Sequence, residues 1–312
     1  MILQPEIKAS REAASIKKGL HWAAILGLVL AVYTIEQTLV SIPLIPFIFR
    51  DVWKSVDAGE QFDAIAFMSK PEVMIICLYG TVITVLVTLF FACKLEKMPL
   101  RCLGMKKKGF LWRYACGLAA GLAFMSGAVF LCKALGCLNF LPGSFSPLIM
   151  LALTFGWLIQ GFSEELLCRG YMMVSLGKRY PAYVGVLLNS LVFALLHSLN
   201  AGISVLAMVN LLLYGIFASL VFLISENIWF ISAFHSIWNL SQSNIYGVLV
   251  SGNPVVTTVV TSEMVPDKDF ITGGAFGLEG GICVTAVYLA GIVAAYLIYR
   301  KKRFTNNTEM SD

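Results

Sequence analysis

Two adjacent carboxylates and one arginine lie within a strongly apolar stretch, WLIQGFSEELLCRGYMM, at residues 157–173. Charges in a segment of membrane-like hydrophobicity cost free energy, so each is expected to have a partner or a function. Glu165 and Arg169 are four residues apart and share one face of a helix, whereas Glu164 is rotated away by about 100°. The spacing predicts that Arg169 holds Glu165 while Glu164 stays available for chemistry.

Two further polar pairs interrupt apolar stretches later in the chain. FALLH places Phe193 and His197 four residues apart, and HSIWN places His235 and Asn239 at the same spacing. Each pair therefore shares a helix face. Counting a rise of about 1.5 Å per residue from the predicted helix ends places these groups at a depth similar to that of Glu164, so we expect three helices to bring them together.

These residue types match the requirements of peptide hydrolysis inside a membrane. A carboxylate can act as the general base that activates water, and neutral imidazoles can bind a divalent metal or orient the water. A side-chain amide can donate to the oxyanion that develops. Each motif also has a structural interpretation, as a Glu–Arg pair, a packed histidine or an interhelical hydrogen bond, so the catalytic interpretation depends on their joint occurrence.

Several other hydrolytic sites are disfavoured. The sequence has no H-E-x-x-H motif and no aspartate in a predicted span, which excludes zincin and paired-aspartate arrangements. It has no G-x-S-x-G turn, and Ser163 has no histidine close to it in sequence. Serine chemistry is therefore disfavoured.

Composition predicts a polytopic α-helical membrane bundle forming a single domain over residues 1–312. Of these residues, 58% are hydrophobic and only 13% are charged, too few to cover the surface of a soluble domain. The net charge of +5 is concentrated in short polar gaps, as expected of topology signals, so no nucleic-acid partner is expected. The eight cysteines have no C-x-x-C spacing and are predicted to be reduced packing residues.

About eight transmembrane helices are predicted, the first as an uncleaved span. Their approximate ranges are 22–49, 73–93, 114–135, 147–176, 182–199, 203–224, 228–249 and 282–299. With both termini in the cytoplasm, the basic gaps at 94–113, 177–182 and 300–303 all lie inside, and the acid-bearing loops 50–72 and 250–281 lie outside.

The first predicted span contains two prolines and a glutamate whose structural roles the sequence alone does not decide. Pro43 and Pro46 are expected to kink or end the helix. Glu36 lies near the middle of the span, where it either contacts another helix or lines a substrate cavity.

Four side-chain amides in the later spans are expected to link helices by hydrogen bonds, namely Gln160, Asn189, Asn210 and Gln242.

The ordered motifs EELLCR, FALLH and HSIWN resemble those of the CPBP intramembrane metalloprotease family, also called the Abi or type II CAAX-protease family. The resemblance covers a core of about residues 150–245, and the glycine-rich TGGAFGLEGG at 272–281 is similar to a stretch of bacterial members. It implies a helical bundle around a buried polar cavity.

The resemblance also implies a role for each motif residue. Glu164 would be the water-activating base, assisted by His197, while His235 and Asn239 would stabilise the oxyanion or help to hold a metal. Glu165, Arg169 and Phe193 would support these groups. A divalent metal ion, with zinc as the first candidate, would be bound by Glu164, His197 and His235.

Two hypotheses about function follow. The first is an intramembrane endopeptidase that cleaves a peptide or protein substrate in a CAAX-protease-like reaction, in the lipid bilayer of a bacterial plasma membrane. The alternative is a non-catalytic membrane scaffold or bacteriocin self-immunity protein of the same family. A transporter is the weaker third interpretation, because the polar groups are too narrowly clustered to line a pathway to both sides.

Overall fold

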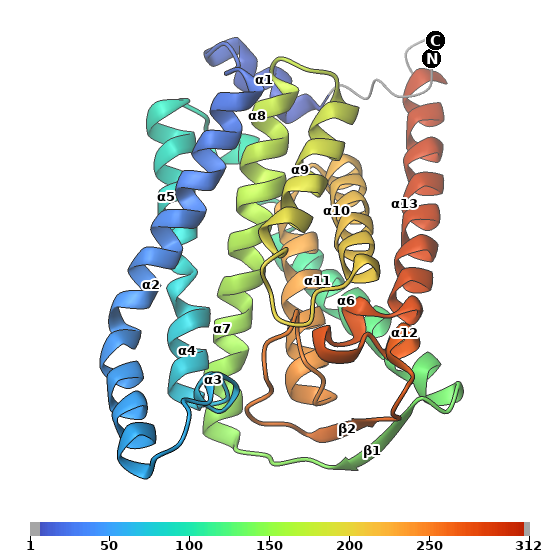
Figure 1. The fold of residues 1–312 in the computed structure, drawn as a ribbon. Coiled ribbons are helices and arrows are strands. Elements are labelled where there is room, and N and C mark those ends of the chain that lie inside the picture. Colours follow the sequence, from blue (N-terminus) through green and yellow to red (C-terminus); the bar gives the residue numbers. More distant parts are fainter. Residues whose placement is uncertain (1–6, 309–312) are drawn as a thin grey trace.

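A computed structural model describes residues 7–308, which form a bundle of long helices closed at one end by a small sheet (Figure 1). The helices are α1 (Lys8–Ile16), α2 (Trp22–Ala58), α3 (Ala64–Met68), α4 (Pro71–Gly80), α5 (Val82–Phe90), α6 (Phe110–Ala134), α7 (Pro147–Glu165), α8 (Val174–Gly177), α9 (Ala182–Leu196), α10 (Val205–Ser225), α11 (Ile228–Leu240), α12 (Asp269–Thr272) and α13 (Ile282–Thr308). Wider π-helical segments are η1 (Phe91–Leu95), η3 (Leu166–Met173) and η4 (Ser241–Ile245). Short 3₁₀ turns are η2 (Leu100–Leu103), η5 (Gly274–Phe276) and η6 (Leu278–Gly280).

The predicted class, a polytopic helical membrane bundle, is confirmed. Within residues 7–308, six helical segments are long and apolar enough to cross a membrane: Trp22–Ala58, Pro71–Leu95, Phe110–Ala134, Pro147–Gly177, Val205–Ser225 and Ile282–Lys301. The predicted fifth and seventh spans correspond to α9, a shorter apolar helix, and to α11 with η4. The number of eight crossings stays a prediction.

The first helix is longer than expected, since α2 passes both Pro43 and Pro46 and ends only at Ala58. Residues 51–58, expected to belong to a loop, are therefore helical. Asp51, which would be an unpaired charge near this end, forms ion pairs with Arg50 and with Lys70, the residue before α4. Charge pairing across the α2–α4 connection is a tertiary contact that the local sequence does not reveal.

Helix α11 occupies the centre of the bundle, between α6 and α7. Three glycines allow this close packing. A Cβ atom at Gly117 or Gly121 of α6 would lie 2.2 and 2.4 Å from backbone oxygens of α11, and one at Gly161 of α7 would lie 2.5 Å from Ser236 Oγ. These helices therefore approach at backbone distance, which fixes α11 relative to α7.

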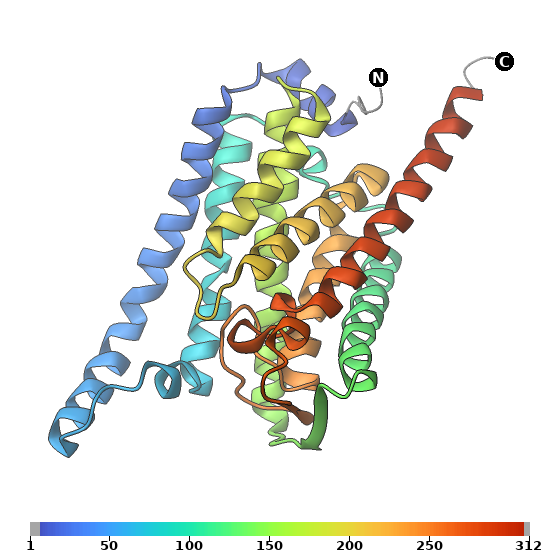
Figure 2. The ribbon, with the colours of Figure 1, turned by 45° about the vertical axis from the view of Figure 1, so that its right-hand side comes forward.

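Helix α2 lies at one flank of the bundle, where it packs against α4 and α5, and α13 lies at the other, against α10 and α6 (Figures 1 and 2). Helix α1 and the far end of α13 are at the same end of the bundle (Figure 1). At that end the basic gap after α5 packs on α1, through Lys17 Nζ to the Leu95 carbonyl at 2.6 Å and through the Arg101–Glu12 ion pair. Helix α1 and the end of α13 therefore share one end of the bundle, and it stays a prediction that both termini lie in the cytoplasm.

The opposite end carries an antiparallel pair of strands, β1 (Leu138–Pro142) and β2 (Val260–Met264), with Leu138 opposite Met264 and Pro142 opposite Val260. Both strands were expected to be loop. Each is short and pairs with a segment more than a hundred residues away, so neither shows a local pattern. The sheet anchors residues 250–281 beneath the bundle (Figure 1).

Candidate active site

Helix α7 ends at Glu165 and continues without a break into the π-helical segment η3 and then α8, so that residues 147–177 form one helical unit. The sequence predicted a single long helix here, but not the wider turns. π-Helical turns occur preferentially at functional sites. Here the wide turns start directly after the two glutamates and contain Arg169.

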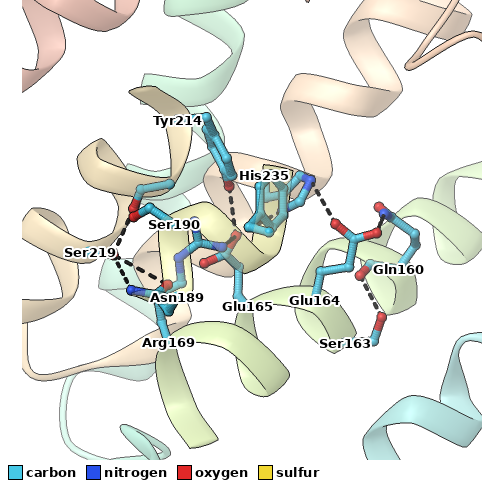
Figure 3. A network of polar contacts seen from close by, with 12 residues as sticks. Gln160, Ser163, Glu164, Glu165, Arg169, Asn189, Ser190, Tyr214, Ser219 and His235 are labelled. Carbon is cyan, nitrogen blue, oxygen red and sulfur yellow. Dashed lines mark hydrogen bonds and ion pairs between the residues drawn. The ribbon is translucent and has the colours of Figure 1, made fainter. Parts of the chain in front are cut away.

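Glu165 is fully buried, and its Oε1 atom accepts three hydrogen bonds. The donors are Arg169 Nη1 at 3.1 Å, Tyr214 Oη at 2.8 Å and His235 Nδ1 at 2.9 Å (Figure 3). They come from three helical elements, η3, α10 and α11. The predicted pairing of Glu165 with Arg169 is present, and Glu165 also orients the histidine of the third motif.

Arg169 is also fully buried and lies against two aromatic rings. Its guanidinium carbon is 4.7 Å from the centroid of Phe193 and 5.3 Å from that of Tyr214. Nε and Nη2 form no hydrogen bond with the described residues, so these cation–π contacts supplement the Glu165 pair. The Phe193 ring also packs against His197 in a tilted arrangement, with ring centroids 4.8 Å apart, and thus connects the arginine to the second motif.

Glu164 has a different environment. Its Oε1 accepts a hydrogen bond from Gln160 Nε2 at 2.6 Å, while its buried Oε2 has no hydrogen-bond partner among the described residues. The closest charged contact of Oε2 is His235 Nε2, at 3.7 Å, beyond direct hydrogen-bond distance. Figure 3 shows Gln160 beside Glu164 and His235 between the two glutamates. One carboxylate oxygen therefore stays available for a ligand.

Both histidines have a fixed tautomer in the neutral form. His235 Nδ1 faces the Glu165 carboxylate, and His197 Nδ1 is 2.8 Å from the Phe193 carbonyl oxygen. These oxygens are acceptors, so each Nδ1 carries the proton and each Nε2 carries the lone pair. As neutral groups, both imidazoles can accept a proton or bind a metal through Nε2, and His235 can donate from Nε2 only when it is protonated.

Asn239 is connected to Glu164 through one intermediate residue. Its Nδ2 donates to Gln160 Oε1 at 2.9 Å, and Gln160 in turn donates to Glu164. The predicted role of Gln160 in linking helices is confirmed, because this bond joins α7 to α11. Since the amide nitrogen of Asn239 carries two protons, the second one remains available for a ligand.

All four predicted catalytic residues line one cavity of about 350 Å³, namely Glu164, His197, His235 and Asn239. Among the described residues no hydrogen bond or ion pair joins Glu164 to His197, which lies just past the end of α9, beside the loop that leads to α10. Glu165 and Arg169 do not line the cavity. The structure thus separates groups that face the cavity from groups that orient them.

Tyr214 was not singled out from the sequence, although it connects much of the site. Its hydroxyl donates to Glu165, and its ring centroid is 5.0 Å from that of His235 and 5.3 Å from that of Phe193. A tyrosine in an apolar helix resembles ordinary packing, and its contacts are with other helices. No signal in the sequence distinguished it.

The residues predicted to hold a metal fit that role only in part. Glu164 Oε2 and His235 Nε2 face one another, and Glu165 fixes the ring as carboxylates do behind metal-binding histidines. However, within residues 7–308 no group of three or more His, Cys, Asp or Glu side chains is arranged to hold a metal ion. Catalytic zinc sites take three protein ligands, so we derive no reaction step through a metal.

Comparison with known families agrees with the motif pattern. Residues 145–241 match the model of a family described as type II CAAX prenyl endopeptidase Rce1-like. The matched segment contains all three motifs and the helices that carry them, from α7 to α11. No curated protein matches the chain, and no solved structure does. The resemblance to the CAAX-protease-like family is thus confirmed.

Proposed function

We propose that this chain is an intramembrane endopeptidase in which Glu164 activates the attacking water. The family match over residues 145–241 supports a CAAX-protease-like membrane endopeptidase at the level of the family. The mechanism rests on one observation above all. Glu164 Oε2 is buried without a hydrogen-bond partner in a cavity that also contains His197, His235 and Asn239.

In this proposal a water molecule binds between Glu164 and the scissile carbonyl. Glu164 removes a proton as the water oxygen attacks the carbonyl carbon, and later passes that proton to the leaving amine. His197 orients the water through the lone pair on Nε2. Because Glu164 has one oxygen held by Gln160, its second oxygen is positioned before the substrate arrives.

The carbonyl oxygen becomes negatively charged during the attack and needs a donor. Asn239 supplies an N–H in every protonation state, whereas His235 supplies one only as the imidazolium ion. Glu165 and Arg169 do not touch the substrate in this scheme. They keep His235 and the π-helical turn in position, which makes them positioning residues.

A divalent metal ion at this site, with zinc as the first candidate, stays a prediction. Glu164 and His235 would hold it, and His197 stays the predicted third ligand. A bound ion would supply Lewis-acid polarisation of the carbonyl. Elemental analysis of the purified protein and of a His235→Ala variant tests this: loss of the metal in the variant supports the assignment, and a metal-free active protein contradicts it.

The proposed substrate is a peptide or protein reached from the bilayer, and the proposed location is a bacterial plasma membrane. The position of the cavity among apolar helices supports a membrane-bound substrate. A prenylated C-terminus is the substrate class that the family description names. Prenylated and unprenylated versions of one peptide would separate these substrate classes.

The decisive experiment compares Glu164→Gln with wild-type protein in proteoliposomes containing quenched fluorescent peptides. Glu60→Gln is the matched control, because Glu60 is an exposed carboxylate after α2. We expect Glu164→Gln to slow cleavage by about 10²- to 10⁴-fold while the control cleaves normally. Cleavage by Glu164→Gln at the wild-type rate would remove this mechanism, and a wild-type protein that binds but never cleaves would favour the scaffold or immunity alternative.

A further inference from the structure

Helix α2 contributes a second carboxylate to the cavity of Glu164. Glu36 is only 7% exposed and lines the cavity together with Tyr33 and Gln37. These three residues are spaced i, i+3 and i+4 and therefore share one helix face. Helix α2 lies outside the segment that matches the family, which begins at residue 145.

Glu36 is not held by a neighbouring helix. Among the described residues its hydrogen-bond partner is Gln37 Nε2, at 2.9 Å, on the same helix. The interhelical contact that was one of the two sequence interpretations is therefore absent from residues 7–308. A buried carboxylate with one neutral donor leaves most of its acceptor capacity unused.

Charge balance distinguishes Glu36 from the other carboxylates of the cavity. Glu279 accepts hydrogen bonds from Trp238 Nε1 and from the backbone and hydroxyl of Ser251. Glu164 has Gln160 and the nearby His235. Among the described residues, Glu36 has neither a second hydrogen-bond donor nor a basic side chain beside it in this cavity.

The cavity as a whole carries an excess of acidic groups. Glu36, Glu164 and Glu279 line it together with His197 and His235, and no lysine or arginine from residues 7–301 does so. The buried Arg169 is engaged by Glu165 outside the cavity lining. Buried charge in an apolar surrounding is costly unless it is paired, so this cavity favours a ligand that brings a positive charge.

We propose that Glu36 is a specificity-determining residue that binds a lysine or arginine side chain of the peptide substrate. This inference rests on the proposed function, because it places the basic side chain in the same cavity as the bond that Glu164 would cleave. Tyr33 and Gln37 would complete the subsite by hydrogen bonding to the cationic group. Peptides without a basic residue would enter with the Glu36 charge unpaired.

The test uses full-length protein in proteoliposomes and pairs of quenched peptides in which lysine or the uncharged norleucine occupies each position in turn. At one position we expect wild-type protein to cleave the lysine peptide with a kcat/KM about ten- to a hundredfold higher than that of the norleucine peptide. Glu36→Gln should abolish this preference by slowing only the lysine peptide. Glu60→Gln should retain the preference in full.

One further variant keeps the result interpretable. Glu36→Asp keeps the charge and should retain a measurable part of the lysine preference. It therefore tests the inference even where Glu36→Gln destabilises the fold. Preference for lysine that survives Glu36→Gln, or no preference at any position, would overturn the inference while the proposed endopeptidase stands. Metal content that falls in Glu36→Gln would overturn it too, because the cation bound at Glu36 would then be a metal ion.

Binding separates failure of this inference from failure of the proposed function. In a Glu164→Gln background, binding of the lysine and norleucine peptides is measured with and without Glu36→Gln. A lysine preference that depends on Glu36 supports the subsite even if the wild-type protein cleaves no peptide. Equal binding of both peptides contradicts the subsite even if the wild-type protein is an active peptidase.

Discussion

The two adjacent glutamates at the end of α7 face different sides of the helix and differ in how many hydrogen bonds they accept. On the packed side Glu165 receives three hydrogen bonds, one of them from an arginine, and all three donor residues are fully or nearly fully buried. On the cavity side Glu164 receives one hydrogen bond and keeps a buried oxygen without a partner. A saturated carboxylate can orient its neighbours, whereas an unsaturated one can react. One helical turn thus supplies both a rigid support and a reactive group.

The largest expected effect is on the cavity side. Glu164→Gln keeps the size of the side chain but removes the general base, which typically lowers kcat by about 10²- to 10⁴-fold. The unfolding midpoint in mixed micelles should stay near the wild-type value, because few contacts are lost. A variant that unfolds instead would show that Glu164 belongs to the packed side.

The next largest effect is expected on the packed side. Arg169→Met removes the cation and leaves the buried Glu165 carboxylate without its arginine partner, which should lower the free energy of unfolding by about 3–5 kcal/mol. The exposed Arg179 offers a control, since Arg179→Met should change little. Adding Glu165→Gln to Arg169→Met should recover part of the loss. Simple addition of the two penalties would contradict direct coupling.

Tyr214→Phe is predicted to have an intermediate effect. It removes one of the three donors to Glu165 Oε1, and a hydrogen bond to a charged group contributes about 1.5–3 kcal/mol. Stability should fall by that amount, while Tyr183→Phe on the exposed face of α9 should be neutral. An unchanged unfolding midpoint would show that Tyr214 only packs.

The smallest effect is expected from Phe193→Leu. The substitution keeps an apolar side chain but removes the ring that faces Arg169 and His197. Loss of the cation–π contact should cost about 0.5–2 kcal/mol, and Phe155→Leu at an exposed position of α7 is the control. Phe193 also lines the cavity, so a KM that rises with little loss of stability would show that it acts there through His197.

The sequence allowed prediction of those features that depend on spacing within one helix. The i, i+4 pairs Glu165–Arg169 and Phe193–His197 are in contact, and the helical stretch 147–176 corresponds to residues 147–177. Mean composition was enough for the membrane class, because charges are too few for a soluble surface. Spacing within one helix is a local property and composition is a global average, and both can be obtained without knowing which helices contact one another.

Contacts between helices could not be predicted in the same way. His235 reaches Glu165 across 70 residues, and Tyr214 reaches it across 49. The β1–β2 pairing and the glycine approach of α7 to α11 also depend on segments remote in the sequence. The third motif could be recognised as a candidate, but that His235 is oriented by Glu165 required the folded structure.

The shortness of α9 has a consequence for how the bundle is closed. Its 15 residues rise only about 22 Å, less than the hydrocarbon thickness of about 30 Å. The irregular backbone after His197 must therefore find protein partners rather than lipid. It finds them in residues 250–281, where Asn200 Nδ2 donates to the Ser251 carbonyl at 3.0 Å and Gly202 meets the backbone of Ala275. Residues 250–281 therefore cover the irregular backbone that follows α9.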